Sequence, residues 1–234
     1  MLVVRKGDDR GAADFGWLRS RHSFSFGSYY DPQHMGVSTL RVINDDWVAP
    51  SGGFDTHGHR DMEIISVVLA GVIEHQDTMG HQHRLQPGDV QVMSAGTGVQ
   101  HSEYNASAQE PLQFLQIWIE PDTHGLKPSY AQQHFGEAKG QTLLASRDAR
   151  DGSLPIHQDA DIYQLVLDAG EHSIPLSEGR TCYLHLYQGE LSITGPSNNA
   201  ETLTGGDAVT ITNEGHLDLQ IKQPGVKALL FDLP

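Results

Sequence analysis

Residues 85–91 read Leu-Gln-Pro-Gly-Asp-Val-Gln, and residues 203–209 read Leu-Thr-Gly-Gly-Asp-Ala-Val. A second pair of segments matches in the same order, because residues 69–73 (Leu-Ala-Gly-Val-Ile) resemble residues 187–191 (Tyr-Gln-Gly-Glu-Leu). In each half we therefore expect a strand, a glycine turn, a returning strand, a Gly-Asp turn and another strand. The repeated order favours an internal duplication and two tandem domains of the same kind.

Short apolar runs separated by Gly, Pro, Asn and Asp recur about every ten residues in both halves, which is typical of an all-β sandwich or barrel. The first half is expected to hold strands at residues 40–43, 62–69, 72–75, 90–93 and 114–119, with residues 44–46 as a turn. The second half is expected to hold strands at residues 163–167, 181–187, 190–194, 208–211, 217–221 and 228–231. A helical period is not sustained over three turns, and only residues 129–135 are compatible with one short helical turn.

The charge balance excludes several classes of protein. The 234 residues include 15 Lys and Arg against 30 Asp and Glu, a net charge of −15. This argues against direct nucleic-acid binding, which depends on neutralising phosphates, and against docking on an anionic membrane. The longest apolar runs are far shorter than the roughly 20 residues of a membrane span, and charges stand where a signal peptide would be apolar. One cysteine, Cys182, suits a reducing compartment, so we expect a cytoplasmic protein.

The 14 histidines are unevenly distributed, with five of them in residues 57–83. Residues i and i+2 of a strand face the same side, so His57 and His59 form one pair and His101 and Glu103 form another. Two such pairs facing each other would bring three imidazoles and one carboxylate together. That set of donors suits iron, manganese, nickel, copper or zinc, and the lack of thiolates disfavours a structural zinc site.

Other side chains compete for these roles. Glu63 has an even offset from His57 and His59, so it is an alternative carboxylate ligand. Three histidines around the turn at residues 77–80 are expected to be exposed: His75, His81 and His83. His22 and His34 are expected to pack or to form hydrogen bonds. In the second half His172, His185 and His216 stand alone, so a metal-free domain is expected there.

Two motifs resemble those of the cupin superfamily. Residues 57–71 follow the pattern His-x-His-x3-Glu-x7-Gly of the first cupin motif, and residues 88–105 resemble the second, with Ser94 where cupins usually have Pro. More specifically, the chain resembles the pirin family of two-domain cupins along nearly its whole length. The segments that carry this resemblance are HSFSF at residues 22–26, YYDP at 29–32, LRVINDD at 40–46, HGHR at 57–60, MSAGTG at 93–98 and HSEY at 101–104.

The resemblance implies a bicupin, with two tandem antiparallel jelly-roll β-barrels packed face to face. Residues 1–147 would form the barrel with the metal site, and residues 148–234 would form a metal-free barrel. In the family the metal, usually iron, is held by the residues that match His57, His59, His101 and Glu103. Fe(II) is therefore the expected ion, with Mn, Ni, Cu, Co or Zn as alternatives. Gly58 stands where many relatives have Pro, which leaves both ligand positions intact.

Some bacterial pirins are similar to quercetin 2,3-dioxygenases, which implies a small aromatic substrate and dioxygen. Glu103 would then act as the catalytic general base, and Phe54, Phe114, Trp118 and residues 24–30 would offer apolar walls. An alternative is a metal-binding regulatory protein with a protein partner, similar to the eukaryotic pirin transcription cofactor. A third is an enzyme for another small aromatic or enediol substrate. A monomer is expected.

Overall fold

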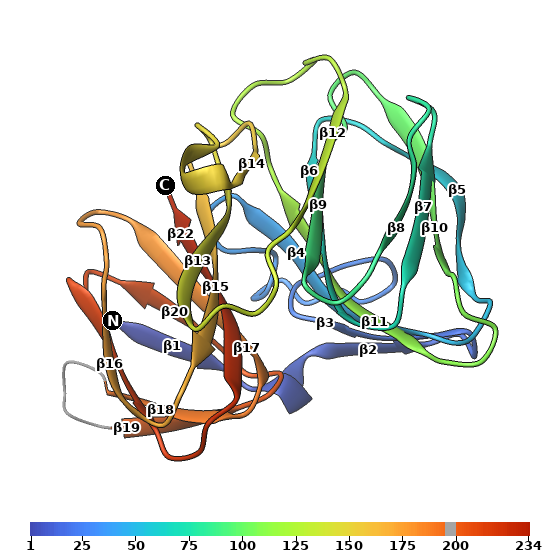
Figure 1. The fold of residues 1–234 in the computed structure, drawn as a ribbon. Helices are drawn as coiled ribbons and strands as arrows, with labels where there is room; N and C mark the ends of the chain where they lie inside the picture. Colours follow the sequence, from blue (N-terminus) through green and yellow to red (C-terminus); the bar gives the residue numbers. More distant parts are fainter. Residues whose placement is uncertain (195–199) are drawn as a thin grey trace.

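The computed structural model describes residues 1–194 and 200–234, and its regular structure is almost entirely β-strand (Figure 1). Two short 3-10 turns interrupt the strands, η1 (Gly7–Asp9) and η2 (Arg150–Gly152). The strands form four sheets, one seven-stranded and one four-stranded in each half. The predicted all-β class is confirmed.

The first half pairs a large sheet with a small one. The large sheet has the order β12-β9-β6-β11-β4-β3-β2 and the small sheet the order β5-β10-β7-β8, and all of these pairings are antiparallel. The strands of the large sheet are β2 (Gly11–Asp14), β3 (Leu18–His22), β4 (Leu40–Val48), β6 (Glu63–Ala70), β9 (Asp89–Ser94), β11 (Leu112–Ile119) and β12 (Ser129–His134). Those of the small sheet are β5 (Gly53–His59), β7 (Ile73–Asp77), β8 (Gln82–Leu85) and β10 (Val99–Asn105).

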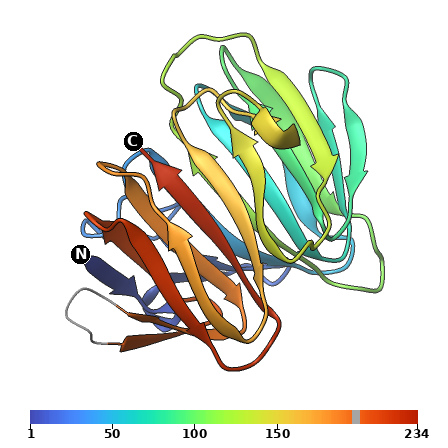
Figure 2. The same cartoon turned by 60° about the vertical axis from the view of Figure 1, so that its left-hand side comes forward.

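The second half repeats this arrangement (Figure 2). Its large sheet has the order β1-β20-β17-β22-β15-β13-β14, and its small sheet the order β16-β21-β18-β19. The strands of the large sheet are β1 (Leu2–Arg5), β13 (Gly140–Ser146), β14 (Leu154–Pro155), β15 (Asp161–Leu167), β17 (Thr181–Gln188), β20 (Ala208–Thr212) and β22 (Val226–Leu233). Those of the small sheet are β16 (Gly170–Pro175), β18 (Glu190–Thr194), β19 (Ala200–Thr204) and β21 (His216–Ile221).

The two large sheets share one hydrophobic core. Ile65 and Val67 of β6 belong to the same buried cluster as Ile162 of β15 and Phe231 of β22. Successive residues of a strand point to opposite faces, so the alternate residues of β6 face the small sheet of their own half. This alternation decides which side chains of the first large sheet can reach the histidines.

The division between residues 147 and 148 stays a prediction, and two strands from its N-terminal side pair with the second half. The register of β1 places Leu2 opposite Ile211 of β20. Strand β13 pairs with β15, with Leu143 opposite Tyr163. The beginning of the chain and the segment before the division therefore both help to build the second large sheet.

Two local predictions are wrong. Residues 129–134 form a strand that pairs with β9, so no helical turn forms there. Residues 44–46 are not a turn but the middle of β4, where Asn44 lies opposite His22 and Gln116. Asn and Asp favour turns when they are solvated, whereas Asn44, Asp45 and Asp46 are at most 6% exposed.

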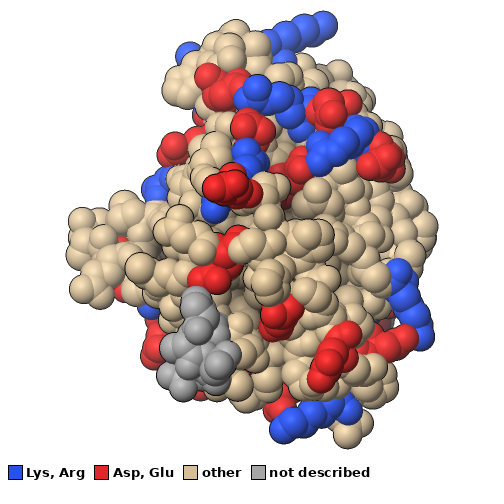
Figure 3. All heavy atoms as spheres, turned by 90° about the vertical axis from the view of Figure 1, so that its left-hand side faces the viewer, with Lys and Arg blue, Asp and Glu red and all other residues tan. Residues whose placement is uncertain are grey.

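No helix among the described residues is long and apolar enough to cross a membrane. On the face drawn in Figure 3, Lys and Arg side chains lie beside Asp and Glu side chains. Opposite charges this close together largely cancel over distances longer than the screening length of about 8–10 Å.

Candidate metal centre

Three histidine rings meet where β5 and β10 run side by side. The register places His101 opposite His57 and Val99 opposite His59. The ring centroids are 4.5 Å apart for His57 and His101, 4.8 Å for His57 and His59, and 4.9 Å for His59 and His101. The predicted convergence of these three imidazoles is therefore present in the structure.

The ring nitrogens are arranged as ligands of one ion would be. Nε2 of His59 lies 2.9 Å from Nε2 of His101. Two nitrogens that bind one ion at right angles, each about 2.1 Å from it, lie about 3.0 Å apart. Nδ1 of His57 donates to the backbone oxygen of Asp55 at 2.7 Å, which leaves its Nε2 free of a proton and able to bind a metal.

Burial keeps two of these rings neutral. Burial, together with the smaller effect of the neighbouring imidazoles, lowers the pKa of His59 to about 4 and that of His101 to about 3. Only a neutral imidazole has a lone pair to donate to a cation. The histidines are therefore ready to bind a metal at neutral pH.

Glu103 is held from one side only. It is 2% exposed, and its Oε1 accepts hydrogen bonds from Nε2 of Gln91 at 2.6 Å and from Oγ of Ser66 at 3.1 Å. Among the residues that the structure describes, no hydrogen-bond partner reaches Oε2 of Glu103 or Nδ1 of His101. A buried carboxylate oxygen without a partner is costly, so this donor set fits a cation.

His75 adds a histidine that we expected to be exposed. It is fully buried, lies opposite Glu103 on β7, and can converge with His101 and Glu103 as a second group of ligands. Its Nε2 lies 3.3 Å from Oδ2 of Asp77, and its ring stacks on Tyr130 at 4.8 Å. His75 lies two residues after Ile73 and therefore shares the inward face of β7 with it. This spacing from an apolar residue was the signal in the sequence that His75 is buried.

Glu63 lies elsewhere. The chain turns between β5 and β6, so Glu63 shares the face of Ile65, which packs against the second half. Its carboxylate accepts a hydrogen bond from Ser94 at 2.7 Å and lies 3.4 Å from Nδ1 of His157. Glu63 belongs to neither group of metal-ligating residues found in the described parts of the chain.

Aromatic side chains border the histidines. The ring of Trp118 lies 5.0 Å from that of His59, and the ring of Phe54 lies 6.3 Å from that of His57. Phe114 packs behind Phe54 at 6.4 Å. Phe24, also considered as a wall, instead packs on Tyr183 in the core between the two large sheets.

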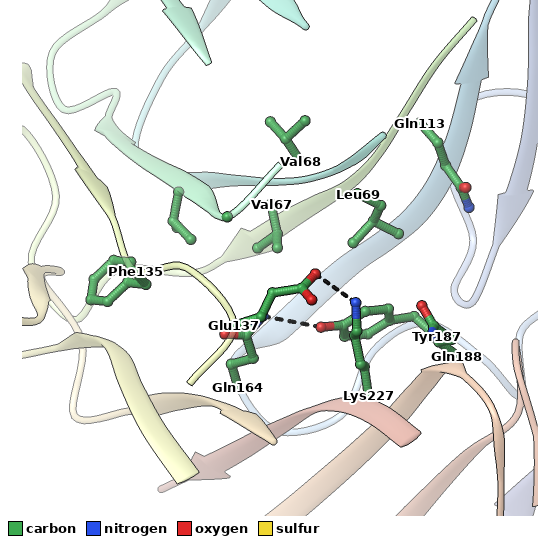
Figure 4. A pocket seen from close by; sticks show the side chains of 12 residues that line it. Val67, Val68, Leu69, Gln113, Phe135, Glu137, Gln164, Tyr187, Gln188 and Lys227 are labelled. Atoms are coloured by element: carbon green, nitrogen blue, oxygen red, sulfur yellow. Dashed lines mark hydrogen bonds and ion pairs between the residues drawn. The ribbon is translucent and has the colours of Figure 1, made fainter. Parts of the chain in front are cut away.

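A separate cavity of about 100 Å³ lies between the two halves (Figure 4). Glu137 and Lys227 form an ion pair at this cavity, and Gln164 donates a hydrogen bond to Tyr187. Its lining includes none of the candidate metal ligands. The chemistry of the histidines is therefore confined to the space between the two sheets of the first half.

Comparison with known proteins decides the family. Residues 4–119 match the family model Pirin, and residues 143–233 match a model described as the quercetinase C-terminal cupin domain. The quercetin 2,3-dioxygenase of Escherichia coli K12 is 43% identical, over 100% of this chain and 99% of that protein. The chain belongs to the pirin family.

Two further relatives of this pirin are informative. A pirin-like protein of Caulobacter vibrioides is 44% identical, over 87% of this chain and 90% of its own. The crystal structure of the bacterial pirin YhhW from Escherichia coli in complex with nickel(II) superposes with a TM-score of 0.93 at 42% identity, covering 100% of this chain and 99% of that one. The histidine cluster and the nickel-bound relative together support a divalent metal centre in this pirin.

Proposed function

We propose that this pirin is a metal-dependent dioxygenase of the quercetin 2,3-dioxygenase type, which opens a flavonol or a related small aromatic substrate with dioxygen. The observation that carries the proposal is the convergence of the imidazoles of His57, His59 and His101, with His101 shared by a second group that contains His75 and the buried carboxylate of Glu103. The full-length relative named quercetin 2,3-dioxygenase supports the choice of reaction.

His57, His59, His101 and Glu103 would hold the ion. We propose Fe(II) as the native metal on the basis of the family resemblance, with Mn, Ni, Cu, Co or Zn as alternatives that these donors accept. When bound, the ion supplies Lewis acidity and, if it is redox-active, one-electron chemistry with dioxygen.

The protein's own contribution is to orient the substrate and to move one proton. Ser66 and Gln91 hold Glu103 through Oε1, so Oε2 is the oxygen that is available both to bind the ion and, when a substrate hydroxyl replaces it there, to accept the proton of that hydroxyl. Phe54 and Trp118 provide apolar surface beside the histidines, against which a flat ring can stack while water is displaced.

Metal analysis paired with oxygen uptake tests this function. Protein purified without chelating resin should hold about one divalent ion per chain and should consume oxygen with at least one member of a flavonol panel, whereas chelator-treated protein should not. A metal-replete protein that consumes no oxygen with any flavonol would overturn the proposed reaction.

The shape of each half, the cellular compartment and the binding partners are also proposed. We propose that each half closes as a jelly-roll barrel, because each pairs a seven-stranded with a four-stranded sheet. We also propose that the protein is cytoplasmic, on the basis of its single cysteine, and that it does not bind nucleic acid directly, on the basis of its net charge of −15. A monomer is the proposed oligomeric state.

A further inference from the structure

A pocket of about 280 Å³ lies beside the histidine cluster, between β3 and β4 of the large sheet and β5 of the small sheet. Phe54 lines this pocket and also neighbours His57. Phe26 lines it as well, and its ring lies 5.3 Å from that of Trp118, which borders His59. The lining of this pocket includes none of the candidate metal ligands, and Phe54 and Phe26 are the side chains that connect it with the aromatic border of the metal centre.

The outer wall of the pocket is aromatic and apolar. It is formed by Phe15, Trp17, Leu18, Phe26 and Phe54. Phe15 is 62% exposed and Leu18 is buried, so this wall runs from solvent into the interior. Trp17 and Phe54 meet edge to face at 5.1 Å. A wall of this composition suits a flat aromatic ring.

The inner wall is polar, and the sheet register explains why. Asn44 on β4 lies opposite His22 on β3 and Gln116 on β11. Asp46, two residues further along β4, lies opposite Ser20. Residues two apart on a strand face the same side, and all five side chains line the pocket. We call these five residues the polar wall; each is at most 6% exposed.

The polar wall has few hydrogen-bond partners. Within the described parts of the chain, no partner reaches either ring nitrogen of His22, Oδ1 of Asn44 or Oδ1 of Asp46. Oγ of Ser20 also has no partner at good hydrogen-bond geometry, although it lies close enough to Asp46 to lower the pKa of that carboxyl group against the larger effect of burial. Buried polar atoms in folded proteins are normally paired with protein groups or with water, so a group of such atoms lining one pocket is available to bind the polar groups of a ligand.

We propose that the polar wall determines specificity within the flavonols: it binds the hydroxyl groups that a flavonol carries in addition to the reacting 3-hydroxyl group, so that more hydroxylated flavonols bind more tightly. This inference rests on the proposed function, which places the reacting end of the substrate at the metal. A phenolic hydroxyl both donates and accepts hydrogen bonds. Oδ1 of Asn44 accepts, and a neutral His22 ring offers one donor and one acceptor. Burial raises the pKa of Asp46 to about 7, so its carboxyl group accepts when ionised and can donate when protonated.

Two physical features agree with this assignment. Burial lowers the pKa of His22, which keeps its ring neutral at pH 7. The pocket volume lies just below the range of roughly 300–1,000 Å³ that is usual for whole drug-sized ligands. The pocket therefore has room for one substituted ring, while the rest of the substrate lies at the histidines.

Two flavonols that share the 3-hydroxy-4-keto end test the polar wall: quercetin, which has four further hydroxyls, and 3-hydroxyflavone, which has none. Binding is measured under nitrogen, where no oxygenation occurs, through quenching of tryptophan fluorescence, because Trp17 lines the pocket. We expect the protein as purified to bind quercetin at least about 10-fold more tightly. In Asn44→Leu and Asp46→Leu this ratio should fall to about 3-fold or less, through weaker binding of quercetin alone.

Gln164→Leu is a matched control. It also removes a buried amide whose Oε1 has no partner among the described residues, but it lies in the second half and should leave the ratio unchanged. Circular dichroism and thermal unfolding establish that each variant is folded. If a leucine variant does not fold, Asn44→Ala and Asp46→Ala give the same comparison.

The outcomes separate this inference from the proposed function. The inference is overturned if the unmodified protein binds both flavonols equally or binds neither. It is also overturned if the variants lose affinity for both flavonols alike, because the polar wall then does not recognise the additional hydroxyl groups. If the preference for quercetin is present but the metal-loaded protein consumes no oxygen in air, recognition stands and the proposed reaction fails.

Discussion

The two halves of this pirin share one arrangement of strands, yet their interiors differ in chemistry. In the first half Ser66 of β6 lies opposite Gln116 of β11 on one side and Gln91 of β9 on the other. Beyond Gln116 the row continues to Asn44 of β4. A buried line of polar side chains thus crosses the large sheet and connects the residues that hold Glu103 with the polar wall.

The second half fills the corresponding positions with apolar side chains. Leu184 of β17 lies opposite Leu230 of β22 and Val209 of β20, and all three belong to one hydrophobic cluster. On the facing small sheet, the pairing of Glu103 with His75 corresponds to the pairing of Leu219 with Ile193.

This difference shows that the scaffold does not require polar residues in its interior. A well-packed apolar row stabilises the second half, whereas the first half buries polar groups without full pairing, at a cost in stability. Such a cost is expected where a site must bind something else. The following substitutions test that contrast, beginning with the largest expected effect.

His57→Ala should abolish stable metal binding. Removing one of three imidazoles opens the ligand set, and we expect the metal content to fall at least about 10-fold. Elemental analysis of protein purified without chelating resin measures this. The control is His216→Ala, an exposed histidine of the second half, which should retain the metal. Full metal content in His57→Ala would contradict the assigned ligands.

Glu103→Gln should retain most of the metal and lose turnover. The amide keeps the shape and one oxygen but cannot take a proton, so flavonol oxidation should fall by a factor on the order of 10²–10⁴. Oxygen uptake normalised to bound metal measures this. Glu63→Gln is the matched carboxylate at the interface between the halves, and we expect its turnover to stay within about threefold of the unmodified protein. A metal-replete Glu103→Gln protein with undiminished turnover would leave Glu103 as a ligand only.

Leu184→Ser introduces into the second half the side chain that the first half has at Ser66. We expect it to lower the free energy of unfolding by about 2–5 kcal/mol, because it removes buried apolar volume and leaves a hydroxyl in an apolar cluster. Urea unfolding measures this loss. Ser66→Ala, which removes the hydroxyl group from the first half, should change stability by less than about 1.5 kcal/mol. Equal losses of unfolding free energy in the two variants would contradict the contrast between a polar interior in the first half and an apolar interior in the second.

Much of the fold could be predicted from local sequence. The glycine and Gly-Asp turns mark strand ends in both halves, and the all-β class follows from their spacing. One exception is the segment 129–135, where a strand forms in place of the expected helical turn. The other exceptions are Asn44 to Asp46 and His75. Both are polar residues inside buried strands, where local preference indicates a turn or an exposed position but the tertiary environment decides otherwise.

The candidate site shows the same division. The period of two residues along a strand was enough to group His57 with His59 and His101 with Glu103, and the structure brings the three rings together. The strand period could not reveal that Ser66 and Gln91 donate hydrogen bonds to Glu103. These residues lie on the opposite sheet, and the register between sheets is set by packing of the whole domain rather than by nearby residues.

The contrast is reversed on the faces where the two large sheets meet. There the second half has a polar side chain, His185 of β17, opposite Ala208 and Leu229. The first half has Val67 of β6 on the equivalent face. Neither ring nitrogen of His185 has a hydrogen-bond partner within residues 1–194 and 200–234. Burial, with a smaller contribution from the nearby Arg10, lowers its pKa from 6.5 to about 3.

This histidine should make stability sensitive to acid. Below pH 6.5 the unfolded chain gains a proton at His185 that the folded protein does not, so the free energy of unfolding falls as the pH falls, by up to about 1.4 kcal/mol per pH unit, and the fall ends near pH 3. His185→Val copies the first half and should remove this contribution while changing stability little at pH 8. Urea unfolding between pH 4 and pH 8 measures the difference in the free energy of unfolding between the two proteins. The contributions of the other buried histidines cancel in this difference, because both proteins contain them. A difference that does not grow as the pH falls would mean that His185 is charged in the folded protein, and that the interface tolerates a polar group there because it is paired.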